Sequence, residues 1–273
     1  MDLATYTPGP PLDAHIEQLI HYRAYRPVHA IERVVPNGRC FLVMELDGME
    51  RRTYHNATLE IESTFRGAWI CGMLRGYISI SAHQDSEMFV VQFRPGGARP
   101  FLRVSMDSIA DRVVPAQDIW GDEPSLLRTR LLEAGTREEK FEVAETWLRQ
   151  HFREELQPPL QILKVLEGLS RTPGERLAEV IEAYPNSRKH LISEFRRYVG
   201  ITPKYFQRIL RFSEVFRQLE NHVEVRWSAV AHHCGYADQA HFIRDFRHFS
   251  GFNPTALLGT GSAPERTNFF PIG

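Results

Sequence analysis

Three absences limit what this chain of 273 residues can be. It has no apolar run near the roughly 20 residues that a membrane-spanning helix needs, so we expect no membrane partner. Its first residues, Met1 to Pro11, lack the basic start and apolar core of a secretory signal, so the cytoplasm is the expected compartment. Its three cysteines, Cys40, Cys71 and Cys234, form no CxxC pair. This argues against a disulfide scaffold and a structural zinc site.

Signatures of catalysis are also missing. The sequence shows no glycine-rich phosphate loop, no nucleophile–histidine–acid set and no paired carboxylates at an informative spacing. His29, His55 and His83 are candidate metal ligands, but His83-Gln84-Asp85 lacks the second histidine of a His-x-His pair. We therefore expect no enzyme activity, no metal and no cofactor.

A near-neutral overall charge hides a division of the chain into two parts. The 33 basic and 34 acidic side chains leave a formal net charge of −1. Residues 157–260 carry 14 basic and 10 acidic side chains, a net +4, whereas residues 1–156 carry 18 and 23, a net −5. A basic part joined to an acidic part indicates that only the C-terminal part meets a polyanion such as nucleic acid.

The N-terminal part has the pattern of short strands separated by turns. Runs rich in Val, Ile, Phe and Leu alternate with turn signals such as Pro36-Asn37-Gly38 and Pro95-Gly96-Gly97. Several short strands at regular spacing predict a β-sandwich or a small barrel. The predicted strands are Cys40–Leu46, Thr58–Ile61, Trp69–Cys71, Gly76–Ser81 and Met88–Phe93.

Helical periodicity replaces the strand pattern after the last predicted strand. Ser125–Leu132 and Arg137–Phe152 are predicted helices, and the second carries an apolar stripe that includes Phe141 and Trp147. This stripe suits either a dimer seam or packing on the barrel. Gln157-Pro158-Pro159 then ends the helical stretch, so we place a domain boundary after residue 156.

The rest of the chain is predicted to be helical up to a glycine- and serine-rich tail. We expect a second domain over residues 157–260 and a tail over residues 261–273 that is frayed until Phe269-Phe270. The predicted fold class is therefore α+β, an N-terminal β-barrel or sandwich with flanking helices followed by an all-α domain. The predicted helices of that domain are Leu160–Leu169, Glu175–Tyr184, Arg188–Val199, Pro203–Asn221, Ser228–His233, Gln239–Phe249 and Pro254–Leu258.

The C-terminal part repeats itself with a period of 51 residues, because Ser187–Pro203 aligns with Asp238–Pro254. Such self-similarity indicates one supersecondary unit that is used twice. The matched pairs include Leu191 with Phe242, Phe195 with Phe246, Arg196 with Arg247 and Gly200 with Gly251.

Each copy has the pattern of an amphipathic helix with a defined start and end. Ser187 and Asp238 are good N-cap residues, and Gly200 and Gly251 suit the left-handed position that follows a helix. Apolar residues at every fourth position predict a buried stripe, and the opposite stripe is polar and basic. A shorter helix and a tight turn, Cys234-Gly235-Tyr236 in the second copy, precede the longer helix. Such an arrangement is a helix-turn-helix.

The second copy resembles the second helix-turn-helix of AraC/XylS-type regulators. The resemblance rests on the run from Gly235 to Arg247, followed by Gly251 and Pro254. The first copy departs from the family at its turn, where Tyr184-Pro185-Asn186 replaces the usual glycine and Ile181 replaces a small alanine. The resemblance implies a DNA-binding transcription regulator. The first copy agrees at Ser187, Leu191, Phe195, Gly200, Thr202-Pro203 and Tyr205.

The N-terminal part is similar to the sensor domain of a subgroup of these regulators. The resemblance implies a cupin-like β-barrel that senses a small-molecule effector or mediates self-association. A barrel of this size holds at most one small molecule. We predict that Trp69, Tyr77, Phe93 and Arg94 line its pocket, with core packing as the alternative role of each. The matching motifs are Pro36-Asn37-Gly38, Phe93-Arg94-Pro95-Gly96-Gly97, Ile109-Ala110-Asp111-Arg112-Val113-Val114 and Trp120-Gly121.

The family implies that two recognition helices enter successive major-groove segments of one promoter site. The joining helix Pro203–Asn221 has a predicted length of about 28 Å, near the ~34 Å turn of DNA, so one monomer is expected to read a bipartite site. We expect bases to be read by Lys189 and Ser193 in the first helix and by Gln239 and Arg244 in the second. The predicted phosphate contacts are Arg188, Arg196, Arg197, Lys204 and Arg247.

The expected partners are double-stranded DNA, a small-molecule effector, RNA polymerase and a second copy of the chain. We expect the second recognition helix to dominate sequence discrimination. His190 and His241 match across the repeat, with packing or capping competing against base contact as their role. One alternative is a cupin-like barrel enzyme fused to a DNA-binding module. Another is a DNA-binding protein whose barrel binds no ligand.

Overall fold

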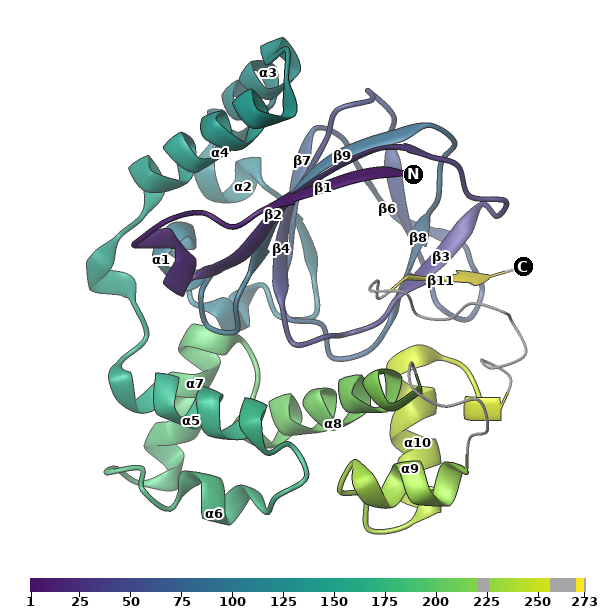
Figure 1. Cartoon of the computed structure of the whole chain (residues 1–273), viewed down its shortest axis with the longest axis vertical. Helices are drawn as coiled ribbons and strands as arrows, with labels where there is room; N and C mark the ends of the chain where they lie inside the picture. Colours follow the sequence, from purple (N-terminus) through teal and green to yellow (C-terminus); the bar gives the residue numbers. More distant parts are fainter. Residues whose placement is uncertain (220–225, 256–268, 273) are drawn as a thin grey trace.

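The computed structural model describes residues 1–219, 226–255 and 269–272. Two antiparallel sheets form a sandwich, helices cover one side of it, and a layer of helices from the C-terminal part lies along one end (Figure 1). This is the predicted α+β architecture. Among the described residues, no helix combines the length and the apolar character needed to cross a bilayer.

The larger sheet contains the longest strands, β2 and β9. Its strands, in spatial order, are β1 (Asp2–Tyr6), β2 (Ile16–Tyr25), β9 (Ser86–Phe93), β4 (Cys40–Glu45), β7 (Ala68–Cys71) and β10 (Val113–Pro115). The smaller sheet contains β11 (Phe269–Ile272), β3 (Ile31–Val34), β8 (Ile78–Ser81), β5 (Arg51–Tyr54) and β6 (Ile61–Phe65).

Helices cover the outer face of the larger sheet. Phe89 and Phe93 of β9 are fully buried there, with ring centroids 5.8 Å from Phe141 and 5.4 Å from Phe101 respectively. Phe141 thus places part of the apolar stripe of the longest covering helix against the larger sheet, which supports packing on the sandwich among the two roles predicted for it. The covering helices are α1 (Arg99–Leu102), α2 (Gln117–Trp120), α3 (Glu123–Glu133) and α4 (Arg137–His151). Single 3₁₀ turns occur at η1 (Leu12–Ala14), η2 (Met106–Ser108) and η3 (Glu154–Leu156).

The C-terminal part is helical, as predicted. One long helix, α8, runs between two groups of shorter helices (Figure 1). Its predicted end at Asn221 and most of the predicted helix Pro254–Leu258 lie outside the described residues. The helices are α5 (Leu160–Arg171), α6 (Leu177–Ile181), α7 (Arg188–Val199), α8 (Pro203–Leu219), α9 (Trp227–His233) and α10 (Gln239–Ser250).

The strand predictions were incomplete, and one was wrong. The segment predicted as the strand Thr58–Ile61 is the end of a turn followed by irregular backbone, in which the Leu59 N–H donates to the His55 carbonyl at 2.8 Å and Leu59 has a φ of +57°. The strand β6 begins only at Ile61, because a left-handed residue interrupts extended pairing. The strands β1, β2, β3, β5, β10 and β11 were not predicted.

The last described strand belongs to the sandwich, although the C-terminal helices separate it from the other strands in sequence. Phe269–Ile272 pairs antiparallel with β3, and Phe270 lies opposite Arg33. The Phe270 side chain is 1% exposed, and its ring centroid lies 5.3 Å from that of Phe216 on α8. The end of the predicted tail is therefore ordered against both parts of the chain. The predicted frayed stretch before it lies outside the described residues.

One hydrophobic cluster runs through both parts of the molecule. It extends from Leu12 through the sheet and helices to Phe246 and Phe270. The domain boundary after residue 156 therefore stays a prediction, because the two parts share apolar contacts rather than an open linker.

Candidate nucleic-acid interface

Matching polar caps define the start and end of the two candidate recognition helices. The Ser187 hydroxyl accepts from the His190 N–H at 3.2 Å, and the Asp238 carboxylate accepts from the His241 N–H at 2.7 Å. Gly200 follows α7 with a φ of +96°, and Gly251 follows α10 with a φ of +71°. These left-handed positions favour glycine. The repeat in the sequence is thus a repeat in local structure.

The buried stripes of the two helices are as the periodicity predicts. On each helix the apolar positions have no more than 1% of their surface exposed, so the opposite stripe faces outward. The buried residues are Leu191, Phe195 and Val199 on α7, and Phe242, Phe246 and Phe249 on α10.

The four predicted base readers are all exposed. Lys189 and Ser193 lie one turn apart on the outward side of α7. On α10, Arg244 occupies the position that matches Ser193 in the repeat, whereas Gln239 matches Arg188. The pair of base readers predicted on α7 and the pair predicted on α10 therefore do not occupy matching positions in the repeat. Gln239 instead lies beside a groove of about 380 Å³, lined by Trp227, Gln239, Ile243, Arg247, Asn253, Pro254 and Thr255.

The predicted phosphate contacts are exposed too, but two of them are engaged within the protein. Arg197 lies 3.8 Å from Glu194, a weak surface ion pair. The Nε of Arg247 donates to the Asn253 side-chain oxygen, which orients its guanidinium beside the groove. No described residue forms a hydrogen bond or an ion pair with the side chains of Arg188, Arg196 or Lys204. These three exposed side chains are therefore available to bind a polyanion.

The matched histidines contribute to their own units. The Nδ1 of His190 lies 2.8 Å from the Tyr184 hydroxyl. The ring of His241 meets the Tyr236 ring edge-on at 5.3 Å between centroids. Both backbone N–H groups serve the caps, which supports packing and capping as their roles.

A buried ion pair joins α8 to the second recognition helix. The Arg208 guanidinium contacts both carboxylate oxygens of Asp245, at 2.8 Å and 3.3 Å, and Asp245 is 4% exposed. Hydrogen bonding to Asp245 raises the pKa of Arg208, so the pair stays ionised. Asp245 was not among the residues predicted from the sequence. Its signal was a lone acid among the apolar and basic residues of that helix.

The first unit is fastened to α8 through backbone carbonyls instead. The Nε of Arg211 donates to the Pro173 carbonyl at 2.8 Å, and the Gln207 amide donates to the Glu175 carbonyl at 2.7 Å. These acceptors lie in the α5–α6 loop. The recognition helix α7 itself receives no charged contact from α8 among the described residues.

The two units touch each other at a pair of glycines. Gly235, in the turn before α10, has a φ of +75°. A methyl group added there would lie 2.5 Å from the Gly174 Cα, in the α5–α6 loop of the first unit. The close approach and the positive φ both favour glycine at this turn.

The sandwich contacts the C-terminal end of α10. The Arg33 guanidinium donates to the Gly251 carbonyl at 3.0 Å and stacks over the Tyr77 and Phe252 rings at 4.6 Å and 4.3 Å. A cation at this end of a helix also complements the helix dipole.

A tyrosine on α8 extends this junction. The Tyr205 hydroxyl donates to the Arg75 carbonyl at 2.8 Å and lies 2.6 Å from the Nε2 of His248. One side chain therefore joins the sandwich, the joining helix and the second recognition helix.

Three of the N-terminal motifs identified in the sequence lie at the junction with the helical part. A methyl group added at Gly38 would lie 3.1 Å from the Phe206 ring, and one at Gly96 would lie 3.0 Å from Leu166. A methyl group added at Gly200, after α7, would lie 3.4 Å from the Ala110 side chain. These motifs thus form the surface on which the DNA-binding part is docked.

The four predicted effector-pocket residues lie in four different places. Phe93 is fully buried under the covering helices, and Arg94 is exposed with its Nε donating to the Asp13 carbonyl. Tyr77 is at the junction under Arg33. Trp69 lies between the sheets, in an apolar cluster with Phe65 and Met88. Effector binding at the sandwich stays a prediction.

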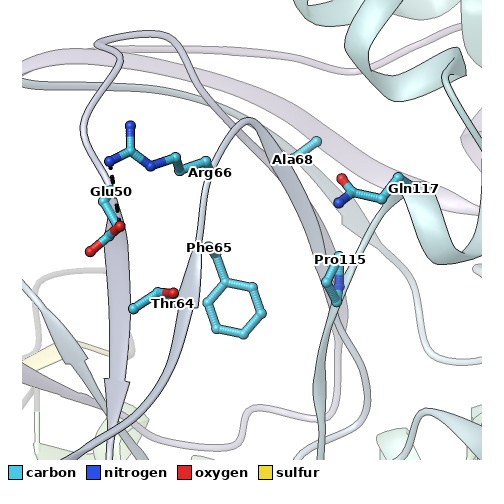
Figure 2. A pocket seen from close by; sticks show the side chains of 7 residues that line it. All are labelled: Glu50, Thr64, Phe65, Arg66, Ala68, Pro115 and Gln117. Carbon is cyan, nitrogen blue, oxygen red and sulfur yellow. Dashed lines mark hydrogen bonds and ion pairs between the residues drawn. The ribbon is translucent and has the colours of Figure 1, made fainter.

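A small pocket opens beside that cluster, at the seam between β6 and β10 (Figure 2). Its volume is about 250 Å³. The Phe65 ring points into it, and the centroid of that ring lies 6.1 Å from that of Trp69. The pocket is lined by Glu50, Thr64, Phe65, Arg66, Ala68, Pro115 and Gln117.

The candidate metal histidines do not converge. His29 lies 2.8 Å from Glu32, His55 lies 3.1 Å from Thr58, and His83 lies 2.8 Å from Ser81. Within the described ranges, no group of three or more histidine, cysteine or acidic side chains is arranged around a common point.

Two capped helices with outward basic stripes, joined by a long helix, define a DNA-binding protein with two helix-turn-helix units. The comparisons with known proteins agree. Residues 182–259 match a family described as a helix-turn-helix domain, and residues 4–115 match a domain of unknown function (DUF6597). The match over residues 182–259 is to a helix-turn-helix domain of the AraC type, which assigns DNA binding to the C-terminal part of the chain.

A comparison with solved structures also returned matches. A crystal structure of ToxT from Vibrio cholerae is 11% identical, with 95% of this chain and 98% of ToxT covered and a TM-score of 0.44. Unsaturated fatty acid bound wild-type ToxT from Vibrio cholerae strain SCE256 is 13% identical, with 89% and 95% covered and a TM-score of 0.45. The curated proteins contain no match to this chain.

Proposed function

We propose that one copy of this protein reads a bipartite promoter site with both recognition helices. The observation that carries the proposal is the pair of helices with equal length, equal caps and outward polar stripes. The joining helix α8 has 17 residues and is therefore about 26 Å long, which is comparable to the ~34 Å turn of DNA.

The assignment of roles follows from exposure and chemistry. Lys189, Ser193 and Arg244 project from the outward stripes, where donors meet base edges in the major groove. Gln239 lies at the first turn of α10, where recognition helices most often approach bases. The exposed arginines and Lys204 supply the salt-dependent contacts to phosphate.

Footprinting on promoter DNA selected by the full-length protein tests this proposal. We expect two protected segments about one helical turn apart from a single bound copy, with the stoichiometry checked by native mass spectrometry. One protected segment per copy, or two copies per site with one segment each, contradicts bipartite reading by a monomer.

We further propose that a small molecule bound at the sandwich modulates DNA binding through the pocket of Figure 2. The pocket has an aromatic floor, and a carboxylate and a guanidinium face each other at its rim, where Glu50 lies 3.4 Å from Arg66. Its volume is below the usual range of about 300–1,000 Å³ for ligand sites, which favours a compact ligand.

Native mass spectrometry of the protein exposed to a bacterial metabolite extract tests this part. We expect a small-molecule adduct that is lost when Thr64→Trp fills the pocket from its exposed rim. The variant Thr58→Trp, on a neighbouring exposed turn, serves as the matched control. Retention of the adduct in Thr64→Trp places the ligand elsewhere.

A further inference from the structure

The groove beside the second recognition helix is lined by one stripe of α10. Gln239, Ile243 and Arg247 follow one another at four-residue intervals and contribute to its wall. Residues at this spacing lie on the same side of a helix. Arg244, the predicted base reader, is exposed but does not line the groove. The groove therefore flanks the part of the helix that is expected to read bases.

The lining of the groove combines apolar surface with exposed polar groups. Trp227, Ile243 and Pro254 are half-buried or buried and supply the apolar surface. The other lining residues are polar and exposed, none of them is acidic, and Arg247 is the one charged residue among them. The volume of about 380 Å³ lies within the usual range of about 300–1,000 Å³ for sites that bind small molecules. This composition suits a partner that joins an apolar ring to a negative charge.

Asn253 orients the charged group of the groove. The Nε of Arg247 donates to the Asn253 side-chain oxygen, and both residues line the groove. Neither Nη of Arg247 has a hydrogen-bonding or ionic partner among the described residues. Two parallel donors of a guanidinium match two oxygens of a phosphate. Because a side chain that is already held loses less conformational freedom on binding, the contact with Asn253 prepares Arg247 to bind an anion.

The first unit carries positive charges at the equivalent place. Arg196 matches Arg247 across the repeat, and Ile192 matches Ile243. The remaining matches are Arg188 with Gln239, Pro203 with Pro254 and Lys204 with Thr255. The two members of each matched pair are exposed or buried to the same degree, so the two surfaces correspond in structure as well as in sequence. The three cations of the first unit have no hydrogen-bonding or ionic partner in the described part of the chain, which indicates that this side of each unit faces a polyanion.

We propose that the groove beside α10 binds the sugar–phosphate backbone of DNA, next to the bases that this helix reads. The Arg247 guanidinium binds a phosphate, and Trp227 and Ile243 pack against the adjoining deoxyribose. In a helix-turn-helix the first helix crosses the backbone, and Trp227 begins that helix, α9. The three cations of the first unit bind the backbone at the equivalent place. This inference rests on the proposed entry of the recognition helices into the major groove, and not on bipartite reading by one copy.

Binding to a random-sequence DNA duplex over a range of salt is the first test, because it needs neither a known operator nor two half-sites. Arg247→Gln is expected to lower the slope of log K against log salt by about 1, and the triple variant Arg188→Gln/Arg196→Gln/Lys204→Gln by about 3. Arg130→Gln, an equal charge change on the exposed face of α3, is the matched control and keeps the wild-type slope. An unchanged slope in Arg247→Gln overturns the assignment of the groove to DNA. Failure of bipartite reading appears instead as a single protected segment in the footprint and leaves these slopes unaffected.

The variant Asn253→Ala tests the positioning of Arg247. The charge stays in place but the guanidinium is freed, so DNA binding is expected to weaken roughly threefold to tenfold at fixed salt while the salt slope stays unchanged. In the Arg247→Gln background the same substitution is expected to have no further effect on DNA binding, because its target is gone. An equal loss in both backgrounds means that Asn253 acts on the fold and not on Arg247, which overturns its positioning role.

The variant Thr255→Glu separates the DNA backbone from a protein partner as the occupant. A carboxylate at the groove repels phosphate, so binding to promoter DNA and to random DNA is expected to weaken alike. Ser125→Glu, an equal change at an exposed position of α3, is the matched control and leaves DNA binding unchanged. Unchanged DNA affinity in Thr255→Glu overturns the proposal, and a simultaneous loss of transcription in vitro from the fully bound promoter assigns the groove to a protein partner.

Discussion

The two helix-turn-helix units have nearly identical recognition helices and very different supports. Each helix has 12 residues, a polar N-cap and a left-handed glycine at its end. The helix of the second unit is held by a charged pair to α8 and by Arg33 of the sandwich. The helix of the first unit has neither contact. Local sequence therefore determines where each helix begins and ends, whereas residues distant in the sequence determine how firmly its orientation is held.

This difference matters for function, because base readout depends on the position of the recognition helix relative to the base edges in the major groove. The second recognition helix carries Arg244. The position of this helix depends on contacts of Asp245, Phe270 and Gly251. The first carries the shorter Ser193 at the matching position. The structure thus supports the expectation that the second unit dominates discrimination, which stays a prediction.

The largest effect is expected from Phe270→Ala. The ring is fully buried against Phe216 and Phe252, so its removal leaves a cavity and lowers the free energy of unfolding by about 3–4 kcal/mol. Denaturant unfolding measures the loss. Phe269→Ala, one residue away but 41% exposed, is the control and changes stability little. Equal losses in both variants mean that β11 contributes as a strand and not through this ring.

Breaking the ion pair between α8 and α10 ranks second. Asp245→Asn leaves the Arg208 guanidinium with a neutral partner in a buried site, and we expect a loss of roughly 2–3 kcal/mol, below the full range for buried pairs because the Arg208 side chain is 31% exposed. Footprinting is expected to show weaker protection of the α10 half-site alone. Glu194→Gln, the matched position on α7, tests the contrast. If the protection of both half-sites weakens equally, Asp245 does not orient the second recognition helix.

The contact between the units comes next. Gly235→Ala introduces a side chain at a positive φ and against the Gly174 backbone, which we expect to cost about 2 kcal/mol in unfolding free energy. The preferred spacing between half-sites is expected to change, as measured by selection from a spacer library. The control is Gly174→Ala, where an added methyl group would find its nearest neighbour at 3.6 Å. An unchanged spacing preference shows that α8 alone sets the distance.

The smallest effect is expected from Arg244→Ala. Loss of one base-reading guanidinium is expected to lower the preference for the cognate site over random DNA by about 1.5 kcal/mol. Ser193→Ala, at the matched position, is expected to lower it less. Competition binding at fixed salt measures both. A uniform loss on all sequences assigns Arg244 to phosphate, and a larger effect at Ser193 reverses the ranking of the two units.

Much of the helical part could be predicted because its signals are local. Ser187 and Asp238 indicate where the two helices begin, and Gly200 and Gly251 indicate where they end. The predicted helix Arg188–Val199 agrees with α7 at both termini. The support of these helices could not be predicted in the same way. The partner of Asp245 lies 37 residues earlier in the chain, and nothing near it indicates Arg208.

The sandwich was predicted only in outline. The long strand β2 mixes inward and outward residues around an irregularity between Ile16 and Gln18, so strict alternation fails. The strand β11 is short and contains Pro271, and its partner Ile31–Val34 lies more than 200 residues away. The predicted effector residues were chosen by type, but strand pairing sends Trp69 between the sheets and Phe93 to the covered outer face.

The pairing of β11 with β3 also affects how this protein folds while it is being synthesised. The larger sheet has all its strands once Pro115 has left the ribosome, but the smaller sheet gains its β11 edge only after the helical part has been synthesised. Until then the backbone of β3 is an unpaired edge, which is open to pairing with other chains. During translation, the nascent sandwich is therefore exposed to aggregation for as long as the DNA-binding part takes to emerge.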